Sequence, residues 1–401
     1  MARRLLYNAR IVNEGKCFCG YVGMADEIIE VVAEGQPSES VVSSYDERED
    51  LEGALLLPGV IDDQVHFREP GLTHKADIAS ESKAAVAGGV TSYMDMPNTM
   101  PQTVTIAELE AKNTRASEVS WANYGFFIGA TNNNIDELRA IDYSNTPGIK
   151  LFLGASTGNM LVDDEKTLDD IFSLEGIIAI HSEDEKIIRD NMAKHKEAYG
   201  DNIPVSCHPA IRSEEACYVS TKRAVERALK HGTRLHVFHL STAKELEFFT
   251  TQPLREKKIT AEVCVHHLWF SDEDYQRLGT RIKWNPAIKT AADRKALQEA
   301  VNSGKVDVVA TDHAPHLLTE KQGDCSKAAS GGPMVQHSLI VMLELAAKGV
   351  FSIEKVVETM SHNPAILYGI NKRGYIREGY YADLVVVKPA KWTVSQDNVL
   401  T

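Results

Sequence analysis

The sequence predicts an α/β protein: a closed (β/α)8 barrel of the TIM type, with a small β-sandwich domain formed by the two ends of the chain. From residue 55 to about residue 370, short apolar runs alternate with segments of helical periodicity. This alternation is typical of parallel strands joined by helices. Short β-type segments with turns flank this region on both sides. We therefore predict a small β domain from residues 1–54 and 371–401, and a barrel from residues 55–370.

The N-terminal segment is predicted to form short strands at residues 5–12, 20–22 and 28–32, followed by an acidic, serine-rich loop at residues 37–50. Cys17 and Cys19 are interpreted as strand residues, because two thiols supply only half of a tetrahedral metal site and no second pair follows. The segments at 374–379 and 382–387 return to a strand pattern. We expect them to pair with the N-terminal strands and complete the small domain.

Eight apolar runs are the candidates for the barrel strands, and they occupy residues 55–66, 90–96, 122–130, 148–154, 177–181, 234–240, 259–266 and 306–311. Helices are expected between them, among others at residues 78–87, 106–119, 214–230, 291–302 and 335–348. In a closed barrel the functional residues lie at the carboxyl ends of the strands. A doubly wound open sheet is the alternative, and it would not arrange the strand ends in a ring.

Composition excludes several classes of function. The formal net charge of −14 argues against a general nucleic-acid-binding protein, because phosphate binding requires a basic surface. A small acidic substrate remains possible, since a few arginines act at short range. The chain contains no apolar stretch long enough for a membrane span and no signal peptide. Its six scattered cysteines do not form a disulfide framework, so we expect a cytoplasmic protein.

Polar side chains follow the ends of several predicted strands. The first run breaks into Gln64, His66 and Arg68, which alternate with apolar residues and therefore face one side of the strand. Further candidate ligands lie in or just after the fourth, fifth, sixth and eighth runs: Lys150, His181, His239 and Asp312. Imidazole and carboxylate groups suit Zn²⁺ or a related divalent ion. Taken singly, His66 is interpreted as a strand-end histidine and Lys150 as a strand-edge lysine; together these residues predict a metal site.

Lys150 is unusual among metal ligands, because an ammonium group repels a cation. A desolvated lysine has a lowered pKa and can react as a neutral amine. Addition of CO₂ would convert Lys150 into a carbamate, which resembles a carboxylate and can bridge two metal ions.

The motifs, in chain order, resemble those of the dihydroorotases of the amidohydrolase superfamily, over nearly the whole chain. They are DDQVHFREPG at 62–71, MPNT at 96–99, GIKLF at 148–152, AIHSE at 179–183, HLS at 239–241, WNP at 284–286, ATDHAPH at 310–316 and ADLV at 382–385. The resemblance implies reversible, metal-dependent hydrolysis of the ring amide of L-dihydroorotate to N-carbamoyl-L-aspartate, in de novo pyrimidine biosynthesis. An allantoinase or a dihydropyrimidinase-like cyclic amidohydrolase is the alternative enzyme.

Carried over residue by residue, the resemblance implies one or two zinc ions. His66 and Asp312 would bind one ion, His181 and His239 the second, and carbamylated Lys150 would bridge them. Asp312 would also take a proton from the attacking water and deliver it to the leaving nitrogen.

Substrate binding is implied for Arg68, Asn98, Asn285 and His316. Arg68 is the most informative of these, because a guanidinium group can pair bidentately with the carboxylate of dihydroorotate. Allantoinases and hydantoinases act on rings without that carboxylate, so Arg68 favours the dihydroorotase. The alternative role for Arg68 is a salt bridge with Glu69 or Asp62.

Two features depart from this resemblance. Gln64 stands where the first histidine of a His-x-His motif is usual, and a neutral amide oxygen is a weaker zinc ligand than imidazole. Gln64 is therefore only a tentative ligand, and a mononuclear site or a catalytically silent structural partner is the alternative. Similar chains usually continue beyond the position of Thr401. We expect a small-molecule substrate, no nucleic acid, no membrane association, and a homo-oligomer, namely a dimer.

Overall fold

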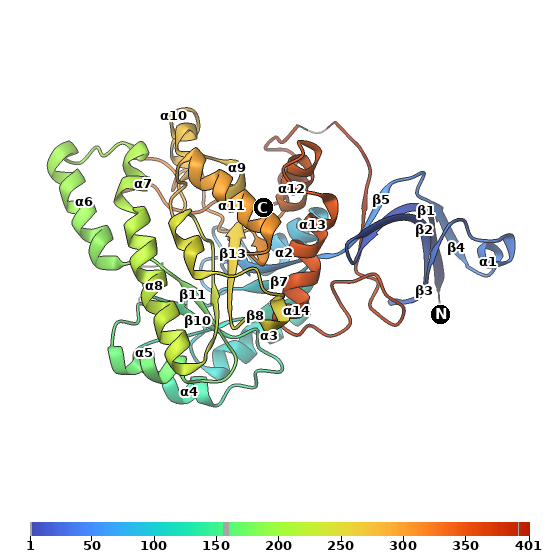
Figure 1. Ribbon diagram of the computed structural model, residues 1–401, viewed down its shortest axis with the longest axis horizontal. Coiled ribbons are helices and arrows are strands. Elements are labelled where there is room, and N and C mark those ends of the chain that lie inside the picture. The colour runs from blue at the N-terminus through green and yellow to red at the C-terminus, as the bar shows by residue number, and fades with distance from the viewer. Residues whose placement is uncertain (1, 155–159, 392) are drawn as a thin grey trace.

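The computed structural model describes residues 2–154, 160–391 and 393–401. Its strands form a small β domain and a barrel, which lie side by side in Figure 1, with the N-terminus in the small domain. The small domain consists of one hydrogen-bonded sheet with the order β15-β5-β1-β2-β3, and β4 pairs with the beginning of β1. These strands span Arg3–Asn13 (β1), Lys16–Ala25 (β2), Ile28–Glu34 (β3), Glu47–Asp50 (β4), Leu55–Pro58 (β5) and Leu384–Val387 (β15).

The small domain has a hydrophobic core of its own, to which both ends of the chain contribute. Leu6, Ile11 and Leu56 pack in it together with Ile376 from the C-terminal part. β15 pairs antiparallel with β5, and Asn13 exchanges hydrogen bonds with the backbone of Ile376. The predicted small β domain is therefore present, and it joins sequence segments more than 300 positions apart.

The described residues form eight parallel strand positions around the barrel, one of which consists of two short strands. They are β6 (Val60–Val65), β7 (Val90–Asp95), β8 with β9 (Asn123–Phe126 and Ile128–Gly129), β10 (Ile149–Phe152), β11 (Ile177–His181), β12 (Arg234–Val237), β13 (Ile259–Cys264) and β14 (Val308–Ala310). The ring closes where Val65 bridges to His313 and the amide of His66 donates to the carbonyl of His313 at 2.7 Å. The predicted barrel fold is confirmed.

The first predicted strand is in fact two strands in two sheets. β5 pairs with β1 and β15 in the small domain, whereas β6 pairs with β7 in the barrel. The chain changes sheet at Pro58 and Gly59, because proline has no amide hydrogen for a ladder and the amide of Gly59 donates to Asp383 at 2.7 Å. The division of the chain at residues 54/55 and 370/371 stays a prediction.

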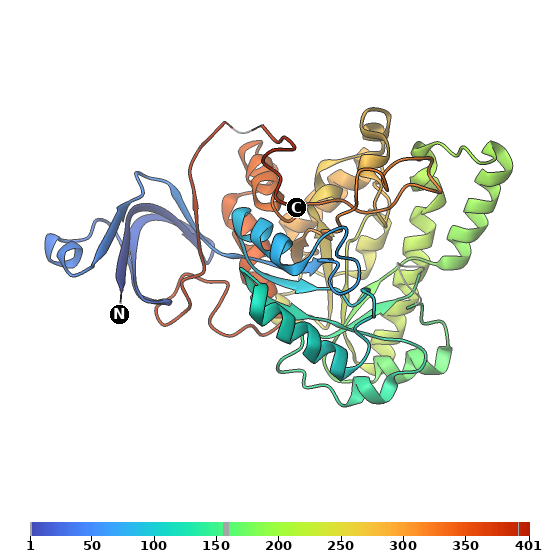
Figure 2. The ribbon, with the colours of Figure 1, turned by 180° about the vertical axis from the view of Figure 1, so that it is seen from behind.

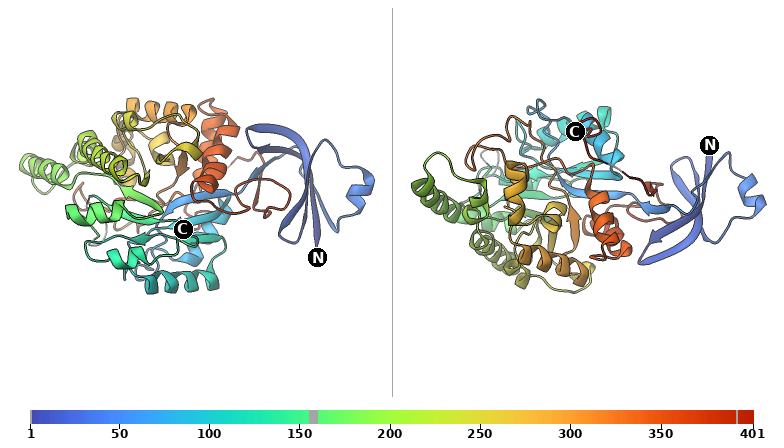
Figure 3. Two further views of the ribbon diagram at one scale, coloured as in Figure 1. Left: turned by 60° about the horizontal axis from the view of Figure 1, so that its bottom comes forward. Right: turned by 90° about the horizontal axis from the view of Figure 1, so that it is seen from above.

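The helices surround the barrel strands, except the short helix at Glu39–Ser43 in the small domain, as Figures 2 and 3 show. They span Glu39–Ser43 (α1), Ile78–Ala87 (α2), Ile106–Val119 (α3), Ile135–Arg139 (α4), Glu165–Phe172 (α5), Glu185–Tyr199 (α6), His208–Ile211 (α7), Glu214–His231 (α8), Val265–Trp269 (α9), Tyr275–Leu278 (α10), Ala291–Ser303 (α11), Ser338–Ala347 (α12), Ile353–Val357 (α13) and Asn363–Leu367 (α14). The small domain lies on one side of the barrel and α6 on the other.

Two segments differ from the predicted secondary structure. Residues 37–50 contain the short helix α1 and the edge strand β4, where a loop is predicted. Residues 374–379, predicted as a strand, form turns around Gly374 and Gly379, which have positive φ angles of 77° and 79°. Within the residues that the structure describes, no helix has both the length and the apolar character needed to cross a membrane.

Candidate active site

A cavity opens at the carboxyl ends of the barrel strands. Nine of the ten predicted site residues line it: Gln64, His66, Arg68, Asn98, Lys150, His181, His239, Asn285 and Asp312. The tenth, His316, contacts Arg68 at the edge of this group. The fold therefore brings the predicted residues together, although they come from seven different strands or strand-end segments.

Three of these residues have strained backbones. Arg68, His239 and Asp312 adopt positive φ angles of 67°, 42° and 44°. For residues other than glycine this conformation costs about 1–3 kcal/mol and persists only where surrounding contacts enforce it. The chain turns sharply after each of these strands, and the turns direct the polar side chains into one cavity.

His66 and Asp312 form the first pair of candidate ligands. Nδ1 of His66 lies 2.9 Å from Asn98 Oδ1, so the ring donates to the amide oxygen and its Nε2 carries the lone pair. This Nε2 lies 3.0 Å from Asp312 Oδ1. Burial lowers the pKa of His66 although Asp312 raises it, so the neutral ring is favoured. Two acceptors then face each other, and this arrangement suits a cation held between them.

His181 and His239 form the second pair, with His181 Nδ1 lying 3.0 Å from His239 Nε2. Nε2 of His181 is buried and lies 3.2 Å from Glu183 Oε2, which also contacts Arg212. Burial raises the pKa of Glu183, but Arg212, His181 and Lys289 together outweigh that effect and the net shift is downward. A carboxylate behind an imidazole is the usual device that fixes the ring of a metal-binding histidine.

Lys150 lies between these groups in β10 and is only 1% exposed. Its Nζ has no hydrogen-bond partner among the described residues and lies 4.1 Å from the centre of the Phe238 ring. Burial lowers the pKa of Lys150 to about 7, while the nearby acids oppose the shift. Near neutral pH a large fraction of this amine is therefore uncharged and able to react as a nucleophile.

The donor atoms of this cavity fit a divalent metal. They include three imidazoles, a carboxylate and a desolvated amine, and the two close pairs coincide with the two ligand groups that the resemblance implies. Gln64 lines the cavity as well, and its Oε1 lies 3.8 Å from Cys264 Sγ. The ligand atoms of two other buried groups lie within 4.8 Å of one another: Cys264 with His266 and His267, and Asp63 with His236 and Glu262.

Arg68 is a buried cation at the rim of the donor group, with 4% of its surface exposed. Its Nε donates to the carbonyl of Pro315 at 3.1 Å, and Nη2 lies 3.1 Å from His316 Nε2. The predicted alternative, a salt bridge with Glu69 or Asp62, does not occur, because Glu69 pairs with Arg115 at 2.8 Å and Asp62 accepts backbone amides. Within the described residues, Arg68 has no ion pair at all.

His316 is held neutral beside Arg68. Burial lowers its pKa to about 3, with Arg68, Lys75 and Lys321 adding to the effect. Lys75 Nζ lies 3.2 Å from Nδ1 and the carbonyl of Ser330 lies 3.0 Å from Nε2. Nε2 therefore donates to the carbonyl of Ser330 and Nδ1 accepts from Lys75, so Nη2 of Arg68 lies beside Nε2 without a hydrogen bond to it.

Sequence reasoning missed Phe152, Ala314 and Lys321, which also shape this cavity. Phe152, Ala314, Ser330 and Gly331 line it. A Cβ atom at Gly331 would lie 2.6 Å from the carbonyl oxygen of Ala314, so only glycine fits there. Lys321 donates to the carbonyls of Lys283, Ala329 and Gly331 at 3.1, 2.9 and 2.7 Å and so fixes this wall. The sequence carries a signal for the glycine turn but none for the buried lysine.

Comparison with known proteins places these observations in a family. Residues 55–400 match the model of the Amidohydrolase family. The dihydroorotase of Halobacterium salinarum is 36% identical over 337 residues, which cover 83% of this chain and 77% of that protein. The dihydroorotase of Methanosarcina mazei is 35% identical over 363 residues, covering 87% of this chain and 78% of that protein.

Other similar proteins carry different names. The allantoinase of Bacillus velezensis is 29% identical over 406 residues, covering 99% of this chain and 87% of that protein. Among solved structures, the L-hydantoinase (dihydropyrimidinase) from Arthrobacter aurescens superposes with a TM-score of 0.89 at 25% identity, covering 96% of this chain and 86% of that one. The architecture described above is thus shared across these enzymes.

Proposed function

Because the chain belongs to the amidohydrolase family, as its motifs predict, we propose that it is a dihydroorotase. It would hydrolyse the ring amide of L-dihydroorotate to N-carbamoyl-L-aspartate, reversibly, in pyrimidine biosynthesis. The enzymes most similar to it in sequence include several dihydroorotases, and their names supply the substrate class for this proposal.

The observation that carries the proposal is the buried, unpaired guanidinium of Arg68. A buried cation without a counterion is costly, and a carboxylate that enters the cavity would compensate its charge. Among the described residues, Arg68 donates through Nε to the carbonyl of Pro315, and its Nη2 lies beside His316 Nε2. Dihydroorotate carries such a carboxylate, whereas the rings of allantoin and dihydrouracil do not.

We further propose that the cavity binds one or two zinc ions. His66 and Asp312 would bind one, and His181 and His239 the other, with Lys150 carbamylated between them; Gln64 stays a tentative ligand. The pKa of about 7 for Lys150 supports carbamylation, because the neutral amine is the form that reacts with CO₂. A bound divalent ion would lower the pKa of water and polarise the ring carbonyl.

In this proposal the protein's own groups perform the remaining steps. Asp312 accepts a proton from the attacking water and returns it to the ring nitrogen as the carbon–nitrogen bond breaks. Arg68 binds the substrate carboxylate, and Asn98, Asn285 and His316 orient the ring. Ser330 and Gly331 form part of the cavity wall.

The decisive experiment is a substrate panel. Purified protein would be assayed on L-dihydroorotate, allantoin and dihydrouracil, as isolated, after chelation, and after zinc is restored. We expect turnover of dihydroorotate alone, lost on chelation and recovered with zinc. Turnover of allantoin or dihydrouracil would reassign the substrate, and no turnover by folded, zinc-loaded protein would indicate the silent structural partner.

A homodimer and a cytoplasmic location also belong to the proposal. Light scattering of the purified chain after size exclusion tests the first, and fractionation of the source cell tests the second.

A further inference from the structure

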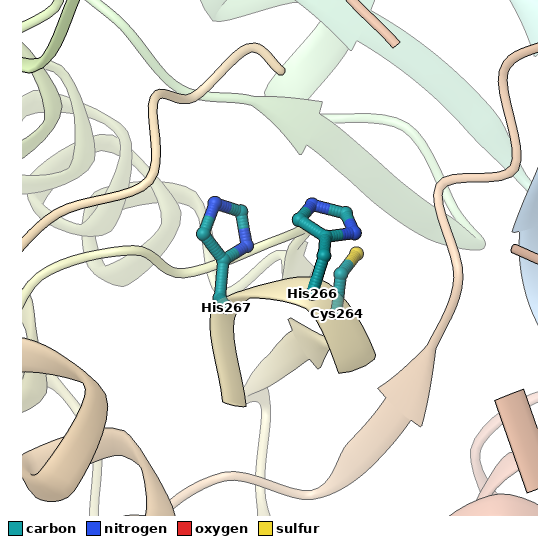
Figure 4. A group of neighbouring side chains, drawn as sticks. All are labelled: Cys264, His266 and His267. Carbon is teal, nitrogen blue, oxygen red and sulfur yellow. The ribbon is translucent and has the colours of Figure 1, made fainter. Parts of the chain in front are cut away.

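A cluster of one thiol and two imidazoles lies at the junction of β13 and α9. Cys264 is the last residue of β13, and His266 and His267 belong to the first turn of α9. Figure 4 shows the three side chains on the same side of this junction, with the sulfur beside the His266 ring. One ligand atom from each lies within 4.8 Å of the other two.

Three of the four imidazole nitrogens of this cluster lack partners among the described residues. Cys264 and His266 are fully buried and His267 is 3% exposed. Both nitrogens of His266 and Nδ1 of His267 have no hydrogen bond among the described residues. An unsatisfied buried polar group costs about 1–3 kcal/mol. Three such atoms beside a thiol therefore indicate that a ligand belongs here.

Ordinary packing accounts for the rings but not for these atoms. The ring of His266 stacks on the ring of Trp284, with 4.5 Å between the ring centres and 8° between the ring planes. This contact uses the face of the imidazole and not its nitrogens. His267 Nε2 lies 3.2 Å from the carbonyl of Pro286, which leaves its Nδ1 toward the cluster. Packing therefore explains why these histidines are buried, but it does not explain why their nitrogens have no partners.

We propose that Cys264, His266 and His267 bind a divalent metal ion of the zinc type. A thiolate and imidazoles are the donors that zinc prefers in tetrahedral sites. Binding would replace the thiol hydrogen, and the proton would leave to solvent. Carboxylate oxygen Oε1 of Glu262 lies 3.4 Å from Cys264 Sγ and would add a negative charge near the cation. The amide oxygen of Gln64, 3.8 Å from Sγ, is the candidate for a fourth donor.

Apart from Gln64, this position shares no donor with the proposed active site. None of the three side chains is among the described residues that line the cavity. Their contacts nevertheless reach the substrate side, because Trp284 and Pro286 flank Asn285, which lines it. An ion in the cluster would therefore fix the segment that carries Asn285, and the proposal does not depend on which ring the enzyme hydrolyses.

Cobalt substitution gives a direct test, because the donors proposed for the active site include no thiol. The starting protein would carry Cys17→Ser, Cys19→Ser and Cys207→Ser, so that no exposed thiol contributes. We expect metal-free protein reloaded with Co²⁺ to develop a sulfur-to-cobalt charge-transfer band in the near ultraviolet. The band should disappear in Cys264→Ser and persist in Cys217→Ser, a matched change at another buried thiol.

Metal content and crystallography complete the test. Zinc bound per chain should fall by one equivalent in Cys264→Ser relative to Cys217→Ser. Should Cys264→Ser fail to fold, crystals of the unaltered chain soaked in zinc would still decide, through anomalous difference density beside Cys264 Sγ. Absence of both the thiol band and this density, in protein whose cavity contains metal, would overturn the proposal without affecting the proposed hydrolase activity.

Discussion

Asn98 Oδ1 accepts the Nδ1 hydrogen of His66 at 2.9 Å and thereby directs Nε2 of the same ring toward Asp312 Oδ1 at 3.0 Å. Without this acceptor, the ring can rotate or change tautomer. We expect Asn98→Ala to weaken metal binding at this position about 10- to 100-fold, the effect usual for loss of such an outer contact. Competition with a fluorescent chelator measures it. Asn113→Ala, which removes a helix-side amide bonded to Leu109, is the control and should leave affinity unchanged.

Arg68 should control selection of an anionic substrate. Arg68→Gln removes the charge and keeps an N–H donor on a shorter side chain. Because hydrogen bonds to charged groups contribute about 1.5–3 kcal/mol, kcat/KM for dihydroorotate should fall about 10- to 100-fold. Metal content, measured on the same samples, should not change. Arg115→Gln, at an exposed site paired with Glu69, is the control; an equal loss in both variants would refute the role of Arg68.

Lys150 should make metal uptake depend on CO₂ and on pH. Its pKa is lowered to about 7, mainly by burial, so the reactive neutral amine increases as pH rises through 7. At a fixed partial pressure of CO₂, we expect zinc uptake by the metal-free protein to accelerate through this pH and then level off. Stopped-flow zinc uptake with an indicator dye follows it. In Lys150→Met the rate of zinc uptake should not depend on CO₂. If the rate in the unaltered protein does not depend on CO₂ either, the carbamate is excluded.

Lys321 should contribute a pH-dependent term to stability. Burial lowers its pKa from 10.5 to about 7, and the charge of Lys283 adds to the shift. Between these two pH values the unfolded chain binds a proton at Lys321 that the folded chain has lost, so raising the pH favours folding. The difference in unfolding free energy between the unaltered protein and Lys321→Met should therefore grow from pH 7 toward 10.5. Denaturant titrations at several pH values measure it, and a pH-independent difference would contradict it.

Lys112 and Asp95 form a buried ion pair whose loss should be costly. Their charged atoms lie 2.5 Å apart at 1% and 0% exposure, and Asp95 Oδ1 accepts the amide of Phe67, next to His66. Lys112→Met leaves a buried carboxylate unpaired, so we expect a loss of about 3–5 kcal/mol in unfolding free energy. The surface pair of Arg139 and Asp136 is the control, and Arg139→Met should cost at most about 1 kcal/mol. Equal losses of unfolding free energy in Lys112→Met and Arg139→Met would show that burial does not increase the contribution of the ion pair to stability.

Where local chemistry decides the structure, the sequence predicts it closely. The bounds predicted for α2 and α3 agree with the structure, because Asp77 and Thr105 each begin the helix with a reciprocal cap. The split between β5 and β6 was not predictable from the continuous apolar run, since the choice of sheet depends on partners more than 300 residues away. β4 was missed because an edge strand of charged residues has the composition of a loop.

The site was predictable to the extent that its residues end strands. Gln64, Lys150, His181 and Asp312 lie in or just after strands of one parallel barrel, so topology alone brings them to one cavity. What surrounds them was not predictable. Lys112, Lys283 and Lys321 are buried lysines, and nothing in their local sequence distinguishes them from surface residues. Their burial follows from tertiary packing, of helix α3 for Lys112 and of loops for Lys283 and Lys321.

The two donors His66 and Asp312 are 246 positions apart and meet where β6 and the segment after β14 come together. The barrel closes along this line, and an ion bound there would link the two sides of the closure. A barrel that is open at this line would not bring His66 and Asp312 together. The affinity for metal would therefore report on whether the barrel is closed. Loss of the ion would accordingly weaken the contact between β6 and β14, the first and last strands of the barrel, including residues that do not contact the ion.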